Sequence, residues 1–282
     1  MKRTALNVFV IITMMSAAAH AAEIQEVKIP SAAMQCEIPA TVILPDSYAG
    51  GERAYSVVYL LNGYSSTHHT VVEFAADILT AAVDTYQIIL FLPDGGYNSW
   101  YFDSPMQPAR KYETHLAEAI AFADSHYRTI AAAAGRAITG GSMGGHGSLF
   151  FGLRHKELFC AIGVLSGAVD FRPWPQEWDL PQILGPKEEF PQRWDEHVAV
   201  GQLDRLKSGE LAVYIDVGTQ DAFLEVNRTL HGKLLEMGIG HIYVERPGQH
   251  DNPYWREAIK YQLFFFGETL STPKMPETNG KG

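Results

Sequence analysis

The run Gly-Gly-Ser-Met-Gly-Gly at residues 140–145 constrains this chain more than any other feature. It follows the apolar stretch 136–139, which is typical of a buried strand, and precedes a stretch with helical character. A serine in the pattern G-x-S-x-G between a strand and a helix is typical of a nucleophile elbow, a turn so sharp that the serine takes strained backbone angles. Side chains two residues to either side would collide in such a turn, and Gly140 and Gly144 avoid the collision. The pattern predicts that Ser142 is an exposed nucleophile; an ordinary flexible turn is the alternative.

Residues 1–21 are predicted to be a secretory signal peptide. Lys2 and Arg3 supply positive charge, residues 6–15 are mostly apolar, and Ala-His-Ala at 19–21 fits a cleavage site that requires small residues. The apolar run is too short to be a comfortable transmembrane span. We therefore expect a periplasmic or secreted protein without a membrane span. A frayed apolar N-terminus on a cytosolic protein is the alternative.

The charge balance argues against nucleic acid as a partner. The formal net charge is −10, and removing the two cations of the signal peptide, Lys2 and Arg3, takes it to −12. An acidic chain without a basic run binds nucleic acid and anionic membranes poorly. Residues 22–270 are long enough for one large α/β domain. Residues 271–282 are rich in Pro, Lys, Glu, Thr and Gly and are predicted to be a disordered tail.

Strand-like apolar runs alternate with amphipathic helical runs from about residue 54 onward. This alternation predicts a mainly parallel sheet covered by helices on both faces. Two earlier segments, 24–29 and 36–44, are expected to form an antiparallel pair at the sheet edge. The later predicted strands are 57–61, 88–92, 137–139, 161–165, 211–217 and 241–245, and the predicted helices are 71–86, 112–127, 143–154, 224–237 and 254–266.

Residues 168–200 break this alternation. They contain five prolines and three of the five tryptophans of the chain. Prolines at that density are expected to prevent a regular helix or strand, whereas the tryptophans argue against disorder. We therefore predict a packed insertion over the C-terminal edge of the sheet, where ligands bind in open α/β sheets.

Metal and disulfide chemistry have little support in the sequence. Cys36 and Cys160 fall in different predicted strands, and two cysteines do not make a stapling framework, so two buried reduced thiols are favoured over a disulfide. The adjacent His68 and His69 point in different directions, and no HExxH or C-x-x-C motif accompanies them. We expect no metal and no cofactor.

A serine hydroxyl needs a base within hydrogen-bond reach to become a nucleophile, and the base needs an acid that orients it. His250 follows the last predicted strand in a loop of turn-forming residues, from which a side chain can reach over the sheet edge. We predict that His250 is the base. His231 lies within a helix, His241 opens a strand, and His197 lies in or just after the insertion, so these three are less suitable.

Asp221 is the favoured acid because it lies just past the predicted strand that ends at Val217. Asp170 follows the preceding strand and remains an alternative, since the acid can lie one strand earlier. Asp216 is still inside its strand and would face a helix layer. Asp251 adjoins the base and would have to fold back to reach it.

The negative charge that develops on a substrate carbonyl oxygen requires two backbone donors, the oxyanion hole. The amide of Met143 is one candidate, because it lies at the N-terminus of the helix after the elbow, where the helix dipole adds to the field. The amide of Tyr64, just after the strand that ends near Leu61, is the other.

Substrate-binding residues are expected on three segments around the sheet edge: the loop after residue 61, the aromatic loop 95–103 and the insertion. Packing of the aromatic loop against the insertion is the alternative to a role in binding. The candidates are Asn62, Gly63, His68, Trp100 and Trp174.

Together these segments resemble the putative-esterase family of α/β-hydrolases, which includes esterase D, S-formylglutathione hydrolases, acetyl and feruloyl esterases and mycolyltransferases. The resemblance covers most of residues 38–266. It rests on six blocks in the right order, which are 59–64, 92–96, 140–147, 165–167, 218–221 and 250–255.

The resemblance implies an α/β-hydrolase fold, a catalytic triad of Ser142, Asp221 and His250, and an oxyanion hole from Tyr64 and Met143. The chain departs from the family pattern at three positions. Asn62 replaces a frequent histidine, Gln249 a frequent glycine and Asn252 a frequent tryptophan, so the acyl or alcohol pocket is expected to differ from that of any one relative.

The combined prediction is an exported serine carboxylesterase. It would hydrolyse short-chain acyl or feruloyl esters, as small molecules or on polysaccharide, through an acyl-enzyme on Ser142. Acyl transfer to a sugar acceptor remains open because the same triad serves both reactions. A carbohydrate-binding protein with an inactive hydrolase fold is the alternative outside enzymes. The sequence does not predict an oligomeric state.

Overall fold

The computed structural model describes residues 21–271. All but the last residue of the predicted signal peptide, and the tail from residue 272, lie outside the described residues. The central sheet has eight strands in the order β1-β2-β4-β3-β5-β6-β7-β8. The strands are β1 (Glu23–Ser31), β2 (Cys36–Leu44), β3 (Ser56–Leu61), β4 (Ile88–Pro93), β5 (Arg136–Gly140), β6 (Ala161–Leu165), β7 (Ala212–Gly218) and β8 (Ile242–Arg246).

The sheet is parallel except at one edge. Strands β1 and β2 form an antiparallel hairpin with Ile29 opposite Ile38, and β2 continues antiparallel to β4. All other pairings are parallel. The predicted edge pair and the predicted parallel sheet are therefore confirmed. The carboxyl ends of β3, β5, β6, β7 and β8 consequently meet at one edge of the sheet.

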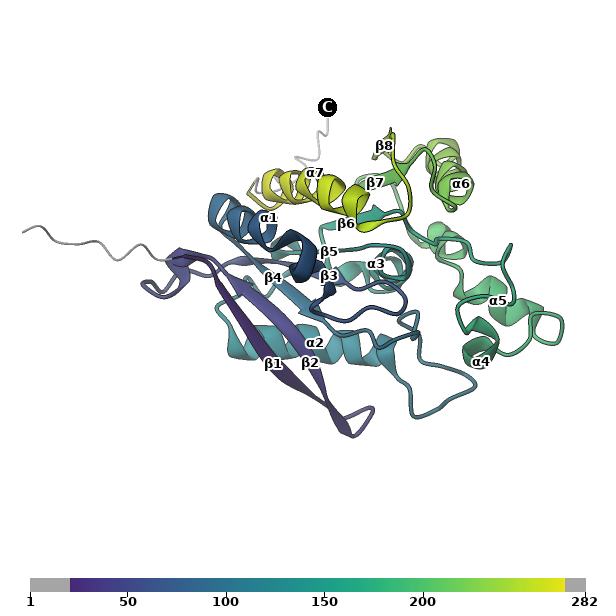
Figure 1. Cartoon of the computed structure of the whole chain (residues 1–282), viewed down its shortest axis with the longest axis horizontal. Helices are drawn as coiled ribbons and strands as arrows, with labels where there is room; N and C mark the ends of the chain where they lie inside the picture. Colours follow the sequence, from purple (N-terminus) through teal and green to yellow (C-terminus); the bar gives the residue numbers. More distant parts are fainter. Residues whose placement is uncertain (1–20, 272–282) are drawn as a thin grey trace, which may run out of the picture.

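Helices cover both faces of the sheet, as Figure 1 shows, with α1 and α7 side by side on one face and α2 on the other. The helices are α1 (Thr70–Tyr86), α2 (Tyr112–His126), α3 (Met143–Arg154), α4 (Leu180–Leu184), α5 (Pro191–His197), α6 (Leu224–Glu236) and α7 (Asn252–Ser271). Short 3-10 helices are η1 (Asp46–Tyr48), η2 (Ala133–Gly135), η3 (Lys156–Leu158) and η4 (Ala199–Arg205). None of the helices within residues 21–271 combines the length and hydropathy needed to cross a membrane.

The pleat of the buried strands divides the core into two clusters. In β3, Tyr59 and Leu61 join the cluster beneath α2, α3 and α6, whereas Val58 and Leu60 join the cluster beneath α1 and α7. Successive side chains of a strand point to opposite faces, so a strand covered on both sides is apolar at every position. All six residues of β3 are buried for this reason.

The insertion contains two short helices, so the prediction that its prolines exclude regular structure was wrong. Pro181 lies in the first turn of α4, and Pro191 begins α5. Proline is tolerated in the first turn because the N–H that it lacks would have no partner within the helix. The predicted packing is confirmed by Trp194, whose ring is fully buried while its Nε1 donates to the carbonyl of Gly185 at 2.9 Å.

The two cysteines are not joined by a disulfide. Cys160 is buried, as predicted. Cys36 is exposed, which contradicts its predicted burial, because it is the first residue of β2, directly after the turn that joins β1 to β2. Most element bounds differ from the predicted ones by one or two residues. Helix α7 differs more, since it extends to Ser271 rather than ending near residue 266, so Ser271 is helical and not the start of the tail.

Candidate active site

Ser142 occupies the tight turn between β5 and α3. Its backbone angles are φ 57° and ψ −117°, and its N–H donates to the carbonyl of Leu165 at 3.0 Å. A Cβ added to Gly140 would lie 2.5 Å from the carbonyl carbon of Gly144, and one added to Gly144 would overlap the carbonyl oxygen of Leu61. No side chain fits at either position, so the two glycines are required by the turn that presents Ser142.

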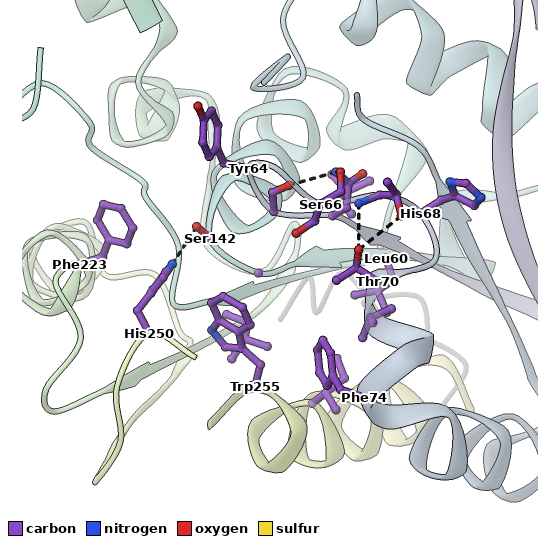
Figure 2. A pocket seen from close by; sticks show the side chains of 18 of the residues that line it. Leu60, Tyr64, Ser66, His68, Thr70, Phe74, Ser142, Phe223, His250 and Trp255 are labelled. Atoms are coloured by element: carbon purple, nitrogen blue, oxygen red, sulfur yellow. Dashed lines mark hydrogen bonds between the residues drawn. The ribbon is translucent and has the colours of Figure 1, made fainter. Parts of the chain in front are cut away.

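The structure brings Ser142, His250 and Asp221 together although they lie far apart in the sequence. His250 Nε2 is 2.9 Å from Ser142 Oγ, and His250 Nδ1 is 2.8 Å from Asp221 Oδ2. Ser142 follows β5, Asp221 follows β7 and His250 follows β8, so the three residues meet at the carboxyl edge of the sheet. Figure 2 shows the bond between His250 and Ser142 at one end of a pocket.

The hydrogen-bond geometry suits general-base chemistry. The other carboxylate oxygen of Asp221 accepts the N–H of Phe223 at 2.8 Å, which orients the carboxylate. With Nδ1–H donating to Asp221, Nε2 of His250 is left to accept the Ser142 hydroxyl proton. The Asp221 side chain is fully buried, whereas that of His250 is 26% exposed and open to a substrate.

The other acid candidates have different partners. Asp170 forms a bidentate ion pair with Arg172, at 2.9 and 2.6 Å. Burial opposes its charge, but the bonds from Arg172 outweigh burial and lower the pKa of Asp170. Asp216 is buried and binds Tyr254 and Arg246. The side chain of Asp251 accepts the N–H of Tyr254 at the start of α7, at 3.0 Å.

The other histidine candidates also have partners away from Ser142. His197 Nδ1 lies 2.7 Å from the carbonyl of Arg193, and its ring packs edge-on against Phe102. His231 Nδ1 lies 2.7 Å from His241 Nε2, so these two rings are partners of each other. His250 is therefore the histidine that the structure places at the serine.

Two backbone segments lie where oxyanion donors are expected. Met143 is the first residue of α3, so its N–H has no partner within the helix. The loop after β3 passes close to the serine, since a Cβ on Gly63 would lie 3.5 Å from Ser142 Cβ. Bonds from the N–H of Ser65 to Tyr97 (2.7 Å) and from that of Ser66 to Gly63 (3.3 Å) hold this loop in shape.

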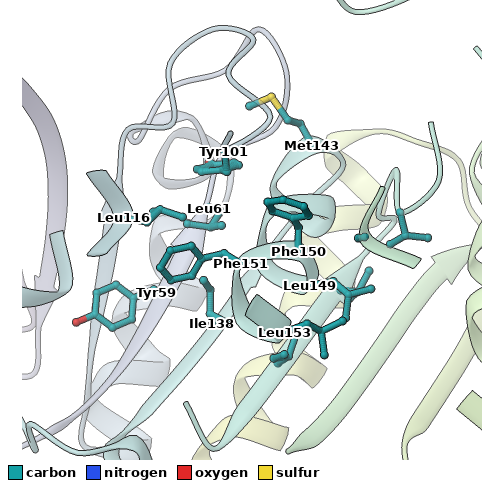
Figure 3. Close-up of a cluster of buried hydrophobic side chains, with 14 of the residues drawn as sticks. Tyr59, Leu61, Tyr101, Leu116, Ile138, Met143, Leu149, Phe150, Phe151 and Leu153 are labelled. Carbon is teal, nitrogen blue, oxygen red and sulfur yellow. The ribbon is translucent and has the colours of Figure 1, made fainter. Parts of the chain in front are cut away.

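Helix α3 is held firmly by buried side chains, which fixes the position of the Met143 amide. Figure 3 shows Phe150 and Phe151 packed among Tyr101, Ile138 and other apolar residues beneath the elbow. The side chain of Met143 is itself buried, and its sulfur accepts the N–H of Trp100 at 3.4 Å. The first turn of α3 therefore has little freedom to move away from Ser142.

An apolar cavity of about 280 Å³ opens beside Ser142. It lies between the loop after β3, the first turn of α1 and the start of α7 (Figure 2). Ser142 and His250 are at one end, and Thr70 and His68 are at the other. Its lining residues are Leu60, Leu61, Asn62, Gly63, Tyr64, Ser66, Thr67, His68, Thr70, Val71, Phe74, Gly141, Ser142, Leu165, Trp178, Ala222, Phe223, His250, Trp255 and Ile259.

Two of the predicted pocket residues, Trp100 and Trp174, do not line this cavity. Trp100 is 1% exposed and packs against Phe171 and Trp178 in the core of the insertion. Trp174 lies behind the cavity wall, in edge contact with Trp178 and Phe223. The aromatic loop therefore supports the wall from behind, as the packing alternative predicts.

The sequence analysis missed four aromatic wall residues. Trp178 belongs to the insertion, Phe223 lies two residues after Asp221, Trp255 is in the first turn of α7 and Phe74 is in α1. The Trp255 ring is 4.9 Å from the His250 ring, in edge contact. Proximity to the predicted acid and base could have indicated Phe223 and Trp255, whereas no sequence signal distinguishes Phe74 from a core residue.

His68 lines the cavity, but its ring nitrogens are both occupied. Nδ1 lies 2.7 Å from Asp94 and Nε2 lies 2.7 Å from Glu26. Burial opposes a charge on the ring, but the bonds to Asp94 and Glu26 outweigh it and raise the pKa of His68. No cluster of three or more His, Cys, Asp or Glu residues within 21–271 has the arrangement of a metal site.

Comparison with known proteins assigns the family. Residues 31–266, most of the chain, match the family described as putative esterase. The chain belongs to the putative-esterase family. An esterase of Mycobacterium tuberculosis is 34% identical to this family member over 136 residues, which is 46% of the chain and 29% of the relative. The chain thus matches less than a third of the length of that relative.

Other relatives match over more of their length. An acetyl esterase of Caldicellulosiruptor saccharolyticus is 28% identical over 220 residues, covering 72% of this chain and 79% of the relative. A fluorophosphonate-binding serine hydrolase of Staphylococcus aureus has a TM-score of 0.78 at 19% identity, covering 88% of this chain and 99% of the other. A ferulic acid esterase has a TM-score of 0.76 at 26% identity, with the same coverage. The predicted α/β-hydrolase fold is confirmed.

Asn62 has a scaffolding role in this member of the putative-esterase family. Its Oδ1 accepts the N–H of Gly95 at 2.7 Å and the hydroxyl of Tyr101 at 3.0 Å. Its Nδ2 donates to the carbonyls of Gly63 and Ser66, both at 3.1 Å. The side-chain amide thus joins the loops after β3 and β4. Asn62 and Gly63, which were predicted to bind substrate, both line the cavity.

Proposed function

We propose that the chain is an exported serine carboxylesterase in which Ser142 is the nucleophile, His250 the base and Asp221 the acid. The observation that carries this proposal is the pair of hydrogen bonds, 2.9 and 2.8 Å, that link Ser142 through His250 to Asp221 beside an apolar cavity. Export is proposed from the signal-peptide pattern of residues 1–21.

The proposed reaction has two steps. Ser142 Oγ attacks the ester carbonyl while His250 Nε2 takes the hydroxyl proton, and Asp221 stabilises the imidazolium. The amides of Tyr64 and Met143 stabilise the carbonyl oxygen as it becomes negative. The C–O bond to the alcohol then breaks, and His250 returns the proton to the leaving oxygen. Water, activated by His250, next attacks the acyl-enzyme and releases the acid and free Ser142.

The cavity supports an acyl group larger than acetyl. A volume of about 280 Å³ is far more than one methyl group fills, and the wall is made largely of aliphatic and aromatic side chains. The hydroxyls of Ser66 and Thr70 lie across the cavity from Ser142, as Figure 2 shows, where they are placed to meet polar substituents on an aromatic acyl ring. We propose short-chain acyl and feruloyl esters as substrates, with the alcohol, a small molecule or a polysaccharide, outside the cavity.

The test compares the mature protein with Ser142→Ala on p-nitrophenyl acetate, p-nitrophenyl butyrate and methyl ferulate. We expect turnover that depends on Ser142, with higher kcat/KM for butyrate and ferulate than for acetate. Labelling by a fluorophosphonate probe should be lost in Ser142→Ala. Equal rates for the two proteins, or no labelling of the wild type, would overturn the proposal.

A second measurement separates hydrolysis from acyl transfer to a sugar. Products are analysed with and without added trehalose or xylo-oligosaccharide. We expect free acid in both cases. An acylated sugar as the main product would replace hydrolysis by transfer, with the same three residues in the same roles.

A further inference from the structure

The backbone is strained where the insertion meets the cavity. Trp178 and Asp179 are consecutive non-glycine residues in the left-handed region, with φ of 53° and 57°. Side chains disfavour this region, and it persists only where the surrounding structure imposes it. The side chains and backbone of these two residues contact the loop after β3, the loop after β4 and α4.

The Asp179 carboxylate collects hydrogen bonds from three segments. Its Oδ2 accepts the hydroxyl of Tyr64 at 3.0 Å and the side-chain N–H of Asn98 at 2.9 Å. Its Oδ1 accepts Nε2 of Gln182 at 3.0 Å. Tyr64 belongs to the loop after β3 and Asn98 to the loop after β4, so one carboxylate joins both loops to the insertion.

Asn98 is itself held in place. Its Oδ1 accepts a hydrogen bond from the Arg110 guanidinium at 2.6 Å, which fixes the amide with its N–H toward Asp179. Burial raises the pKa of the Tyr64 phenol, and the adjacent Asp179 raises it further, so the phenol stays a donor. Two donors therefore point at a single oxygen, an arrangement that suits a charged carboxylate.

The same turn holds one wall of the cavity. The carbonyl of Trp178 accepts the indole N–H of Trp100 at 3.2 Å, and the Trp178 ring lines the cavity. The Trp178 ring packs 5.3 Å from Phe223, whose own ring is 5.0 Å from that of His250. A change in the turn is thus passed to the wall beside the base.

We propose that Asp179 is a positioning residue that holds the Tyr64 amide in the oxyanion hole and Trp178 in the cavity wall at the same time. The inference rests on the proposed function, because it assigns a role in that reaction. Asp179 reaches the oxyanion amide only through the Tyr64 side chain. Loss of the carboxylate removes the restraint that joins the Tyr64 side chain to the insertion and lets the turn at Trp178 relax.

The test measures kcat and KM for p-nitrophenyl butyrate with Asp179→Asn, Tyr64→Phe and the double variant. Tyr64→Phe removes only the hydroxyl and keeps the ring, which packs against Tyr97. We expect each single variant to lower kcat about tenfold with little change in KM, since an oxyanion donor acts mainly in the transition state. The double variant should be no worse than Asp179→Asn alone, because both changes remove one connection.

Asp195→Asn is the matched control. Asp195 is a carboxylate of the same insertion, and its bond to Arg172 at 2.7 Å does not reach the loop after β3. We expect wild-type kcat and KM for this variant. A general loosening of the insertion would lower kcat in the control as well and would overturn the proposal.

Melting temperatures of all variants separate folding from positioning. If Asp179→Asn does not fold, Tyr64→Phe alone decides, and a wild-type kcat for Tyr64→Phe overturns the proposal. If the wild type hydrolyses the butyrate ester and the Asp179 and Tyr64 variants have the same kcat, this inference is overturned and the esterase proposal stands. A wild-type protein that hydrolyses none of the esters overturns both.

Discussion

The Arg256 guanidinium of α7 donates to the backbone carbonyl of Phe74 in α1 at 2.6 Å. This bond lies where α1 is kinked, because Ala75 has non-helical angles of φ −140° and ψ 17°. A kink interrupts the hydrogen bonding within a helix, and here Arg256 serves as an external donor. The same guanidinium holds Asp77 of α1 with two bonds, at 2.8 and 2.6 Å. Arg256 therefore joins two helices, α1 and α7, that both contribute residues to the cavity wall.

We predict that Arg256→Met shifts the acyl preference toward longer chains. Phe74 lines the cavity from α1, and Trp255 and Ile259 line it from α7, so loosening the bond lets the first turn of α1 move outward. The ratio of kcat/KM for p-nitrophenyl octanoate to that for the acetate should rise about threefold to tenfold, the scale that one or two methylene groups are worth in an apolar pocket. Steady-state kinetics on an ester series measures the ratio.

Arg228→Met is the control for this prediction. Arg228 makes a comparable bidentate pair with Glu245, at 2.7 and 2.8 Å, between α6 and β8 and away from the cavity. The ester ratio of this variant should equal that of the wild type. An unchanged ratio in Arg256→Met would show that the pair between α1 and α7 has no part in acyl selection.

The turn at Ser142 predicts opposite outcomes for alanine substitutions at Gly144 and Gly141. Gly144→Ala should lose at least about 2 kcal/mol of unfolding free energy and most of its activity, because the new methyl group meets backbone that cannot yield. Gly141→Ala should be tolerated, since its Cβ would meet only the Leu165 carbonyl at 3.9 Å. Urea unfolding and butyrate turnover of both variants check this. Equal losses in the two would argue against the elbow as the cause.

The two acid candidates give a further prediction. Asp221→Asn should lower kcat by about 10⁴, the scale for a triad acid whose loss leaves the base in the wrong tautomer. Asp170→Asn should keep kcat within about threefold, because it breaks only an ion pair with Arg172 that is partly exposed to solvent. If Asp170→Asn lowers kcat more than Asp221→Asn does, Asp170, after β6, is the acid.

Two elements around the serine, the helix that follows it and the next strand, could be predicted to the residue. The bounds of α3 (Met143–Arg154) and β6 (Ala161–Leu165) agree with those inferred from apolar periodicity. Both segments are buried, so the pattern of apolar residues dictates their form. The sequence also indicated His250 and Asp221, because loops after parallel strands meet at one edge, and the structure links them to Ser142 by two successive hydrogen bonds. Their catalytic roles stay predictions.

The cavity wall could not be predicted in the same way. Trp100, Trp174 and Trp178 are equally apolar, and only the path of the insertion decides that Trp178 faces the cavity. The partners of His68 include Glu26 of β1, forty-two residues earlier in the chain, so no local pattern reveals that both ring nitrogens are occupied. The two helices of the insertion were missed because prolines in a first turn resemble prolines that prevent a helix.

His146, just after the elbow, gives a prediction for acid stability. The side chain is fully buried, with Nε2 donating to the carbonyl of His197 at 3.0 Å and Nδ1 without a hydrogen-bond partner among the described residues. Burial lowers the pKa of His146 from 6.5 to about 3. The unfolded chain therefore binds a proton between these pH values and the folded chain does not, so stability is complete above pH 6.5 and falls as the pH falls toward 3.

Replacing His146 by glutamine should remove this part of the pH dependence. Between pH 7.5 and pH 5 the histidine should cost the wild type about 2 kcal/mol of unfolding free energy. His146→Gln keeps a donor for the His197 carbonyl and does not titrate. Between pH 7.5 and pH 5 its unfolding free energy should therefore fall by about 2 kcal/mol less than that of the wild type, even if the variant is less stable at pH 7.5. Urea unfolding at both pH values measures the difference, with exposed His126→Gln as the control that should follow the wild type. Parallel losses in wild type and His146→Gln would mean that the acid sensitivity arises from other groups.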